Sequence, residues 1–354
     1  MPPLPDRVHV LVPFWGMAGG VIKILDYADH LAQSGVWVTL WAPSLPQADD
    51  LVHSLPVVSR LLSRRSVDLK ELADLAFDDH NPWVLFTEPT HRKNIDDATV
   101  EPLGHRLIHL VQGTRHADPR WQDGYNYRLL HRPMSRIAVS HQVAAAIRPL
   151  ADRTFDLRTI VEGHDTAYFA SRPISQNVPE DRPLRVLYTT WKSDLGDRVA
   201  AAMSGDSRLR FIAARTPLGW PSLRNRYHGA DVMLCTPGPA EGFYLPGLEA
   251  MAARAVVVTA LVGGNEAYVS RGQNALVATY DDVDSHVAAL SWLSEDESLR
   301  ARLIEGGAIT CENHTLQRER TELLDVLRSL VTDETPSPSI SPHSPGVKAE
   351  GTYI

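Results

Sequence analysis

The stretch VHVLVPFWGMAGGVIKILDYADHLAQSGVWVTLWA, residues 8–42, has the pattern of a strand, a glycine loop, a helix and a second strand. Residues 8–13 form a continuous apolar run, which is typical of a parallel strand covered on both faces. Residues 21–34 place apolar side chains at helical spacing, and Gly35 ends this predicted helix. Residues 36–42 are the second strand. The unit predicts a parallel sheet with a helical crossover.

The same alternation continues through the first half of the chain. Further short strands are predicted at 83–87, 107–111 and 136–140, and a long helical stretch is predicted at 57–77. Strands that alternate with helices favour an open, mostly parallel sheet wound on both faces. The polar segment 171–183, which contains three prolines, is then predicted to be a linker.

The alternation restarts after this linker, so the chain is predicted to contain two doubly wound α/β halves. Strands are expected at 185–189, 210–213, 231–236 and 255–260. Residues 299–330 are predicted to be helical, with a break near Gly306 and Gly307. The expected organisation is a Rossmann-like domain over 1–172, a second over 173–311, a helix over 312–331 that packs back on the first domain, and a disordered tail over 332–354. Ligands of such sheets bind beyond the carboxyl ends of the strands.

The composition of the chain disfavours several classes of protein. The 354 residues carry a formal net charge of −8, which argues against a dedicated nucleic-acid binder. The two cysteines, Cys235 and Cys311, have no metal-ligand spacing and suit a reducing compartment. The sequence has no run of 18 apolar residues and no basic start typical of a signal peptide, so a cytoplasmic enzyme is expected.

The segment TPGPAEGFYLPGLEAMAAR, residues 236–254, carries the most specific chemistry. A predicted strand ends in a glycine-containing loop, and a helix begins near Pro246, a residue that suits the first helical position. The start of this helix favours a phosphate. Glu249 is then able to accept hydrogen bonds from a ribose diol, and Glu241 from a sugar hydroxyl. Taken alone, both acids are also ordinary choices for an exposed loop and a helix start.

This segment resembles the signature of family 4 glycosyltransferases, in which two glutamates are separated by seven residues. The matching pieces are EGFYLPGLEAMAARAVVV (241–258), GGNEAYV (263–269), GQNALV (272–277), GMAGGVIKILDYADHLAQSG (16–35) and VEGHDTAYF (161–169). The resemblance implies the GT-B arrangement, in which two Rossmann-like domains face each other across a cleft. It also implies sugar transfer from a nucleotide sugar with retention of the anomeric configuration.

The resemblance assigns roles to individual residues. Glu241 is expected to contact the donor sugar. The family places an arginine and a lysine after the first strand of the second domain, whereas the stretch YTTWKSDLGDRV has neither in register; Lys192, its nearest cation, joins Glu241 as a catalytic candidate, and Arg198 is the next cation. The donor-binding residues are expected to be Gly19, Gly20, Gly242, Phe243, Tyr244, Leu245, Pro246, Glu249 and Arg198. No metal and no cofactor are expected, because cationic side chains and a helix start would neutralise the leaving diphosphate.

Two further positions differ from the family pattern. Arg254 stands where the family has glycine, and since arginine does not readily take a positive φ, we expect this helix to end differently. Gln112 follows the strand 107–111, where many family members have histidine. A glutamine here, followed by polar and aromatic residues, is similar to bacterial rhamnosyltransferases, so a deoxyhexose linked to a thymidine nucleotide is one candidate donor. The residues expected on the acceptor side are Glu88, His91, Gln112 and His116.

The sequence therefore predicts a metal-independent retaining glycosyltransferase. It would move a sugar from a UDP- or dTDP-linked donor to a hydroxyl of a small-molecule, lipid-linked or polysaccharide acceptor. One amphipathic stretch carries basic residues and is compatible with peripheral contact to an anionic membrane; an ordinary domain helix has the same pattern. Its basic residues are Arg60, Arg64, Arg65 and Lys70. A nicotinamide dehydrogenase is disfavoured, because the glycine spacing is wrong and no acid follows the second strand. A non-catalytic nucleotide-sugar binder and an epimerase- or phosphorylase-type sugar-phosphate enzyme remain open.

Overall fold

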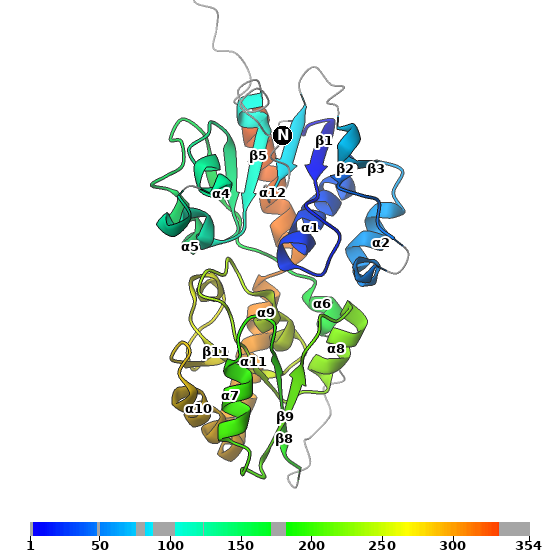
Figure 1. Cartoon of the computed structure of the whole chain (residues 1–354). Helices are drawn as coiled ribbons and strands as arrows, with labels where there is room; N and C mark the ends of the chain where they lie inside the picture. Colours follow the sequence, from blue (N-terminus) through cyan, green and yellow to red (C-terminus); the bar gives the residue numbers. More distant parts are fainter. Residues whose placement is uncertain are drawn as a thin grey trace, which may run out of the picture.

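The chain forms two α/β halves stacked one on the other (Figure 1). The computed structural model describes residues 3–47, 50–75, 82–87, 103–122, 124–170 and 182–332. The predicted linker at 171–183 and the predicted tail at 332–354 lie almost wholly outside these ranges, so both stay predictions.

The N-terminal half is built on a seven-stranded sheet with the order β3-β2-β1-β4-β5-β6-β7. Its strands are β1 (Arg7–Leu11), β2 (Trp37–Ala42), β3 (Val67–Glu71), β4 (Trp83–Phe86), β5 (Leu107–Val111), β6 (Ser135–Ala138) and β7 (Leu157–Thr159). All neighbouring strands are parallel, and Val10 in the central strand lies between Leu40 and Leu85. The apolar runs read from the sequence are therefore the buried centre of the sheet, as expected for strands covered on both faces.

The helices of this half are α1 (Gly19–Gln33), α2 (Pro56–Leu62), α4 (Tyr125–Leu129), α5 (His141–Ile147) and α6 (Thr166–Phe169). Helix α1 is buried over nearly its whole length, because α12 (Leu316–Thr332) packs against it. Helix α6 follows the point where the chain leaves the N-terminal sheet.

The C-terminal half is built on a five-stranded parallel sheet with the order β12-β11-β10-β8-β9. Its strands are β8 (Leu184–Thr189), β9 (Leu209–Ala214), β10 (Val232–Leu234), β11 (Val256–Ala260) and β12 (Ala275–Ala278). Its helices are α7 (Leu195–Ala202), α8 (Trp220–His228), α9 (Leu245–Ala252), α10 (Val283–Glu295) and α11 (Glu297–Asn313). Helix α9 packs on α11, and α7 packs on α10.

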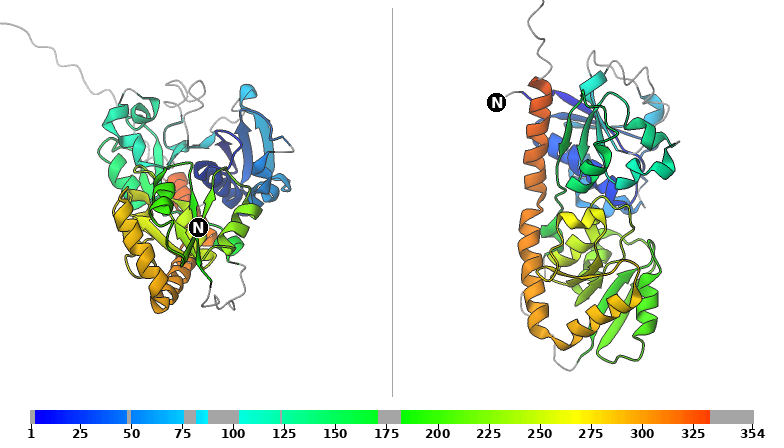
Figure 2. Two further views of the ribbon diagram at one scale, coloured as in Figure 1. Left: turned by 60° about the horizontal axis from the view of Figure 1, so that its bottom comes forward. Right: turned by 90° about the vertical axis from the view of Figure 1, so that its left-hand side faces the viewer.

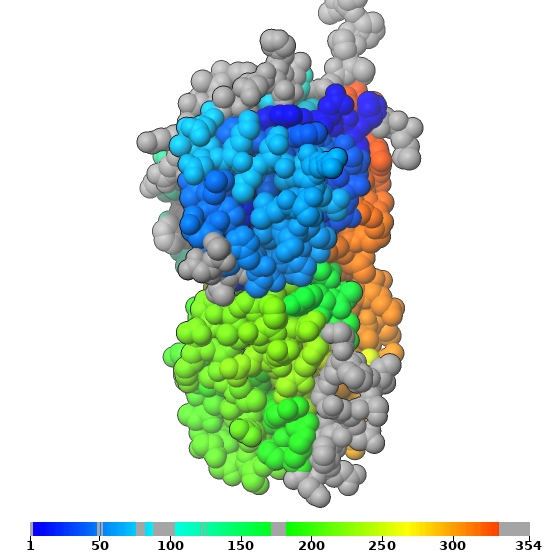
Figure 3. Space-filling model, turned by 90° about the vertical axis from the view of Figure 1, so that its right-hand side faces the viewer, coloured from blue at the N-terminus to red at the C-terminus, as the bar shows by residue number. Residues whose placement is uncertain are grey.

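The chain returns to the N-terminal half through α12. Helices α11 and α12 run along one edge of both halves (Figure 2, right). At the crossing, the amide of His164 donates to the carbonyl of His314 at 2.9 Å. Nearby, Lys23 of α1 contacts both carboxylate oxygens of Glu319 in α12 at 3.0 Å. Helices α1 and α12 thus meet beside the segment that leaves the N-terminal half. The two halves also meet on the side face shown in Figure 3, where the orange C-terminal helices are seen along one edge of the view.

Two predicted helical features are wrong. The stretch 57–77 is not one helix, because α2 ends at Leu62 and the chain then enters β3, which pairs with β2 along the sheet edge. Helix α11 runs through Gly306 and Gly307 without a break. A Cβ on Gly306 would lie 2.1 Å from the carbonyl oxygen of Gln273, so this glycine serves close packing rather than a helix end.

The end of α9 corrects a third expectation. Arg254 does take a positive φ, 63°, although it is not glycine. The amide of Arg254 donates to Met251 at 3.0 Å and that of Ala255 to Ala250 at 2.9 Å, which is the Schellman pattern. The helix therefore ends as a glycine-terminated helix does, and the left-handed residue costs about 1 kcal/mol.

Candidate active site

The loops that follow strands in the two halves meet directly. A Cβ on Gly242 would lie 2.1 Å from the carbonyl oxygen of Gln112, and one on Gly113 would lie 3.3 Å from the carbonyl oxygen of Ala240. The loop after β10 thus abuts the loop after β5, and glycine is the residue that permits this approach. The structure therefore brings together residues that lie about 130 positions apart in the sequence.

The start of α1 lies at this junction and leaves its first backbone amides without a side-chain cap. Gly19 is exposed, no side chain caps the helix, and the first turn holds no acidic residue. Gln112 fixes this turn, because its Nε2 donates to the carbonyl of Gly20 at 2.9 Å and to Thr87 Oγ1 at 2.7 Å. The amides of a first helical turn have no partner inside the helix and favour a negative group. Leu245 of α9 lies 3.6 Å from the Cβ position of Gly19, so the starts of α1 and α9 are neighbours.

Glu241 and Lys192 come together beyond the carboxyl ends of β10 and β8, two neighbouring strands of the C-terminal sheet. Lys192 Nζ forms a short ion pair with Glu241 Oε1, and the amide of Gly238 donates to the same oxygen at 3.2 Å. Both side chains keep contact with solvent, with exposed fractions of 37% for Lys192 and 18% for Glu241. Lys192 Nζ also lies 5.2 Å from the ring centroid of Tyr244. The two residues predicted to be catalytic are therefore in contact, and both side chains are partly exposed to solvent.

Tyr244 sets the direction of α9. It is the N-cap, with φ 67° and ψ 69°, an outlying conformation for a bulky residue. Tyr268 holds it there, since its hydroxyl donates to the carbonyl of Tyr244 at 2.8 Å. A Cβ on Gly247 would lie 2.3 Å from that hydroxyl oxygen, so only glycine fits. Strained backbone of this kind clusters at ligand sites.

The predicted donor residues of this loop do not all present side chains to a ligand. Phe243 is buried and packs 5.1 Å from the Tyr268 ring, and Leu245 is buried beside α1. Pro246 is half-buried. What this stretch offers to a ligand is the backbone of the loop and of the first turn of α9.

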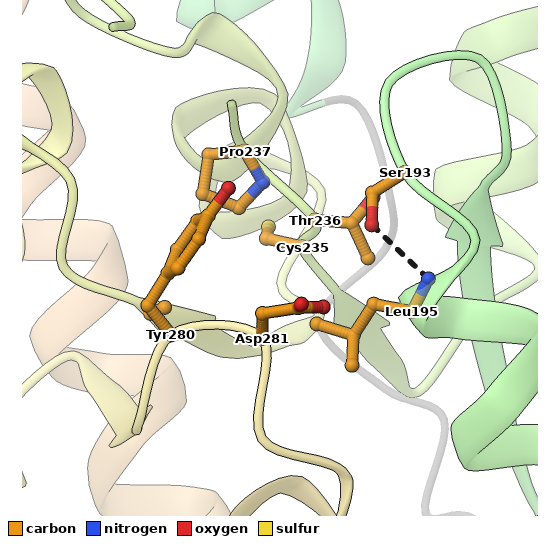
Figure 4. Close-up of a pocket in the computed structure, with 8 residues that line it drawn as sticks. Ser193, Leu195, Cys235, Thr236, Pro237, Tyr280 and Asp281 are labelled. Atoms are coloured by element: carbon orange, nitrogen blue, oxygen red, sulfur yellow. Dashed lines mark hydrogen bonds between the residues drawn. The ribbon is translucent and has the colours of Figure 1, made fainter. Parts of the chain in front are cut away.

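A pocket opens at the carboxyl ends of β8, β10, β11 and β12 (Figure 4). Its lining residues are Ser193, Leu195, Cys235, Thr236, Pro237, Ala260, Tyr280 and Asp281. The Tyr280 ring stands at one wall and is 48% exposed, and the amide of Leu195 donates to Ser193 Oγ at 3.1 Å. None of these residues is among the site candidates expected from the sequence, although Thr236 and Pro237 open the segment 236–254. Their shared signal is position, because each follows a strand of the parallel sheet or lies in the next loop.

Arg198 does not line this pocket, but it pairs with Asp281, which does. It lies on α7 and pairs with Asp281 and with Asp194, in both cases at the surface. Hydrogen bonding to Asp281 raises the pKa of the Arg198 guanidinium. The cation next to Glu241 is Lys192, so Lys192 is placed better than Arg198 to meet a diphosphate at the start of α9.

Glu249 is not placed as expected. Its carboxylate is 3% exposed, Oε1 lies 3.1 Å from Nε2 of His164, and Oε2 accepts from the hydroxyl of Tyr227 at 2.8 Å. Both oxygens are thus used inside the protein. The sequence indicated the helical turn correctly but not the direction of this side chain, which depends on α8 and on the crossover segment.

The predicted acceptor residues have mixed outcomes. Glu88 and His91 lie outside the described residues. Gln112 reaches the junction, as described above. His116 is 1% exposed and packs 5.8 Å from the ring of His109 inside the N-terminal half. Burial, and then the charge of Arg115, lower the pKa of His116 to about 3, so it is a neutral interior histidine rather than a surface group that faces an acceptor.

The basic stretch predicted to favour membranes is divided between a helix and a strand. Arg60 and Arg64 both pair with Asp29, at 2.7 Å and 3.4 Å, and Lys70 lies on β3 with its Nζ 5.2 Å from the Trp41 ring centroid. Within the described ranges no helix has the length and apolar character needed to cross a membrane. The same ranges hold no cluster of three histidine, cysteine or acidic side chains arranged for a metal ion.

Comparison with known proteins gives a local sequence match. Residues 217–309 match the family model described as glycosyl transferases group 1. The chain is 34% identical over 136 residues to D-inositol 3-phosphate glycosyltransferase of Salinispora tropica, which is 38% of this chain and 27% of that protein. It is 30% identical over 147 residues to the lipopolysaccharide core biosynthesis mannosyltransferase LpsB of Rhizobium meliloti, which is 41% of this chain and 40% of that protein. The chain thus spans well under half the length of these curated relatives.

Solved structures match over nearly the whole chain. HepE from Anabaena, crystallised with UDP and glucose, aligns with a TM-score of 0.67 at 14% identity and covers 92% of this chain and 100% of its own. Sucrose-phosphate synthase from Thermosynechococcus elongatus aligns with a TM-score of 0.66 at 15% identity and covers 93% and 100%. These likenesses show the fold, and the GT-B architecture expected from the sequence is confirmed. The chain therefore carries a match to glycosyl transferases group 1 over residues 217–309 on a GT-B fold.

Proposed function

We propose that this protein is a retaining glycosyltransferase that moves a sugar from a nucleoside diphosphate sugar to an acceptor hydroxyl without a metal ion. The observation that carries the proposal is the Lys192–Glu241 pair in the loops that lead into the C-terminal half's site, close before α9, whose first residue Leu245 lies beside Gly19 at the start of α1. An ion pair with solvent access, next to two helix starts, suits a ligand that joins a sugar to a diphosphate. The relatives and structural neighbours named above support the same class of reaction.

The donor is proposed to lie across the junction. Its diphosphate would sit between the first turns of α1 and α9, where Lys192 supplies the positive charge. Its sugar would lie beside Glu241, whose carboxylate accepts hydrogen bonds from hydroxyls. Its base would occupy the pocket at Tyr280, whose exposed ring provides a flat apolar surface. The acceptor would enter from the N-terminal half, near Gln112.

The proposed chemistry is a displacement at the anomeric carbon. The acceptor oxygen forms the new bond, the bond from that carbon to the diphosphate oxygen breaks, and the acceptor proton passes to the departing phosphate. Attack from the side of the leaving group retains the configuration. The protein contributes orientation, and the Lys192 cation with the two helix starts stabilises the charge that develops on the leaving group.

The first test is calorimetric titration of the protein with UDP, dTDP, GDP and ADP in the presence of EDTA. We expect one nucleotide to bind wild type and to bind Lys192→Met at least tenfold more weakly. The matched control is Lys70→Met, a lysine on β3 far from the junction, which should bind like wild type. Absence of binding by every nucleotide would overturn the donor site.

The second test is turnover. With the donor sugar attached to the nucleotide that binds, the protein should release free nucleoside diphosphate in the presence of an acceptor. Proton NMR of the product should show the anomeric configuration of the donor. Inverted product would refute the retaining mechanism, and binding without turnover across acceptors of all three classes would favour a non-catalytic binder. Product formation that stops with EDTA would refute metal independence.

A further inference from the structure

Exposed apolar side chains gather in the loops after β1 and β2, which we call the apolar loop pair (residues 12–18 and 43–47). Phe14 in the first loop is 45% exposed, and Leu45 in the second is 43% exposed. The two strands are neighbours in the sheet, and the indole of Trp15 donates to a backbone carbonyl of the second loop at 2.7 Å. Exposed apolar side chains that adjoin one another are typical of a binding surface, whereas single ones are common everywhere.

The apolar loop pair borders the proposed donor site. Its first loop (dark blue in Figure 1) runs directly into α1, and Gly19 at the start of that helix lies beside Leu245 of α9. Gln112, where the acceptor is proposed to enter, donates to the carbonyl of Gly20 in the same helical turn at 2.9 Å. The apolar loop pair is therefore placed to hold the body of an acceptor whose hydroxyl lies at the junction of the two halves.

A second contact to the C-terminal half bounds the same surface. Ser54 Oγ lies 3.8 Å from Met17 Sδ in the first loop and accepts from the amide of Trp220 in α8 at 3.0 Å. The loop pair is thus bordered by the start of α1 on one side and by this contact on another. An occupant enclosed in this way is favoured to be compact rather than a long polymer.

The two loops carry no charge with which to recognise a ligand. Residues 10–22 and 40–48 include no acidic and no basic residue. The arginines of the neighbouring basic stretch are used elsewhere, since Arg60 and Arg64 both pair with Asp29. Anionic lipid surfaces are bound by clustered basic side chains, so this surface is not of that kind.

Side-chain hydrogen-bonding groups are also scarce on the two loops. Their sequence supplies only the indole of Trp15, the hydroxyl of Ser44 and the amide of Gln47. The indole is bonded to the carbonyl of Ser44, and Gln47 Nε2 donates to the carbonyl of Leu45 at 3.2 Å. A surface of apolar and aromatic side chains with few polar groups suits an apolar ligand rather than a saccharide chain.

We infer that the acceptor is a soluble small molecule whose hydroxyl is carried on a flat apolar ring system, and that Phe14 and Leu45 hold that ring. This inference rests on the proposed function and selects one of its three acceptor classes. Transfer of the ring from water onto the apolar loop pair supplies affinity, and the polar groups at the junction orient the hydroxyl. A polysaccharide meets too few hydrogen-bonding side chains on these loops, and a lipid phosphate meets no basic one.

The test measures the binding of 4-methylumbelliferone, a flat hydroxyl-bearing aromatic compound, by equilibrium dialysis against the full chain in the presence of the nucleotide that binds. The variants are Phe14→Ser, Leu45→Ser and the matched control Ile309→Ser, whose side chain is 53% exposed on α11. We expect the control to bind like wild type and the other two variants to bind about tenfold more weakly, because they lose apolar contact area. All three variants should bind the nucleotide within about twofold of wild type.

Maltotriose and vesicles of phosphatidylglycerol represent the other two acceptor classes. Tighter binding of maltotriose than of the aromatic compound would overturn the inference, as would vesicle binding that Phe14→Ser abolishes. Equal affinity of wild type, Phe14→Ser and Leu45→Ser for the aromatic compound would also overturn it, because the compound would then bind elsewhere. In these cases nucleotide binding would leave the proposed donor site standing. Absence of binding by every nucleotide would instead remove the proposed function, and the inference with it.

Discussion

Replacement of Glu319 by glutamine should destabilise the protein by about 3 kcal/mol. Glu319 is fully buried between α12 and α1, where Lys23 Nζ contacts both of its oxygens at 3.0 Å. It also pairs with His30 at 2.9 Å and accepts from the amide of Gly163 at 3.0 Å. Glutamine keeps the size of the side chain but removes the charge, so among the described residues Lys23 keeps only the carboxylate of Asp26, at 2.9 Å, as an ion-pair partner.

The pKa of Glu319 gives the pH dependence of this contribution. Burial acts to raise the pKa, but Lys23 and His30 outweigh burial and lower it from its ordinary value of 4.5. The folded state is therefore favoured when Glu319 is charged. Since the folded pKa is the lower one, this contribution is complete above pH 4.5 and is lost as the pH falls toward 2.

The assay is urea unfolding followed by tryptophan fluorescence and circular dichroism, at pH 7 and at steps down to pH 3. The control is Glu322→Gln, one turn later on α12, whose pair with Arg318 is partly exposed and should contribute less than about 1 kcal/mol. The difference between wild type and Glu319→Gln should be about 3 kcal/mol at pH 7 and should shrink below pH 4.5. A loss under about 1 kcal/mol at pH 7, or one no larger than that of the control, would refute the reasoning.

Three further predictions concern the site and α9. Glu241→Gln should lower kcat about 100-fold with a smaller effect on nucleotide affinity, which steady-state kinetics and titration separate; a pure affinity loss would contradict the assignment. Gly242→Ala should abolish turnover, because the new Cβ would lie 2.1 Å from the carbonyl oxygen of Gln112, whereas Gly205→Ala meets nothing within 4 Å and should act like wild type in the same assay. Arg254→Gly should stabilise the protein by up to about 1 kcal/mol in urea unfolding, since glycine takes the positive φ without strain; a destabilised variant would refute this.

Much of the fold could be predicted because its signals are local. The apolar runs at 107–111 and 255–260 correspond to β5 and β11 within a residue, and α1 begins at the glycines that precede its apolar spacing. Strand β3 was missed because it is a half-exposed edge strand without a continuous apolar run. Its pairing with β2, rather than its own composition, selects the strand over a helix.

Some residues of the candidate site could likewise be predicted from the sequence, and others could not. Glu241 and Lys192 were each expected at the site on separate grounds; they are 49 positions apart, and the structure brings them into contact because both follow neighbouring strands of one parallel sheet. The pocket at Tyr280 and Asp281 was missed because an aromatic and an acid in a loop carry no local signature. His116 looked like a surface loop residue, and only the packing of η5 (Thr114–Ala117) against the sheet shows that it is buried.

Residue type and spacing were enough to predict the alternation of strands and helices, the two halves, and the chemistry available at the carboxyl ends of the strands, because they act over a few positions along the chain. The folded structure was needed to show that Gly242 abuts Gln112, that Arg254 takes a left-handed conformation, and that Glu249 turns to His164 and Tyr227. The direction and burial of a side chain depend on partners distant in sequence, whose positions are set by packing.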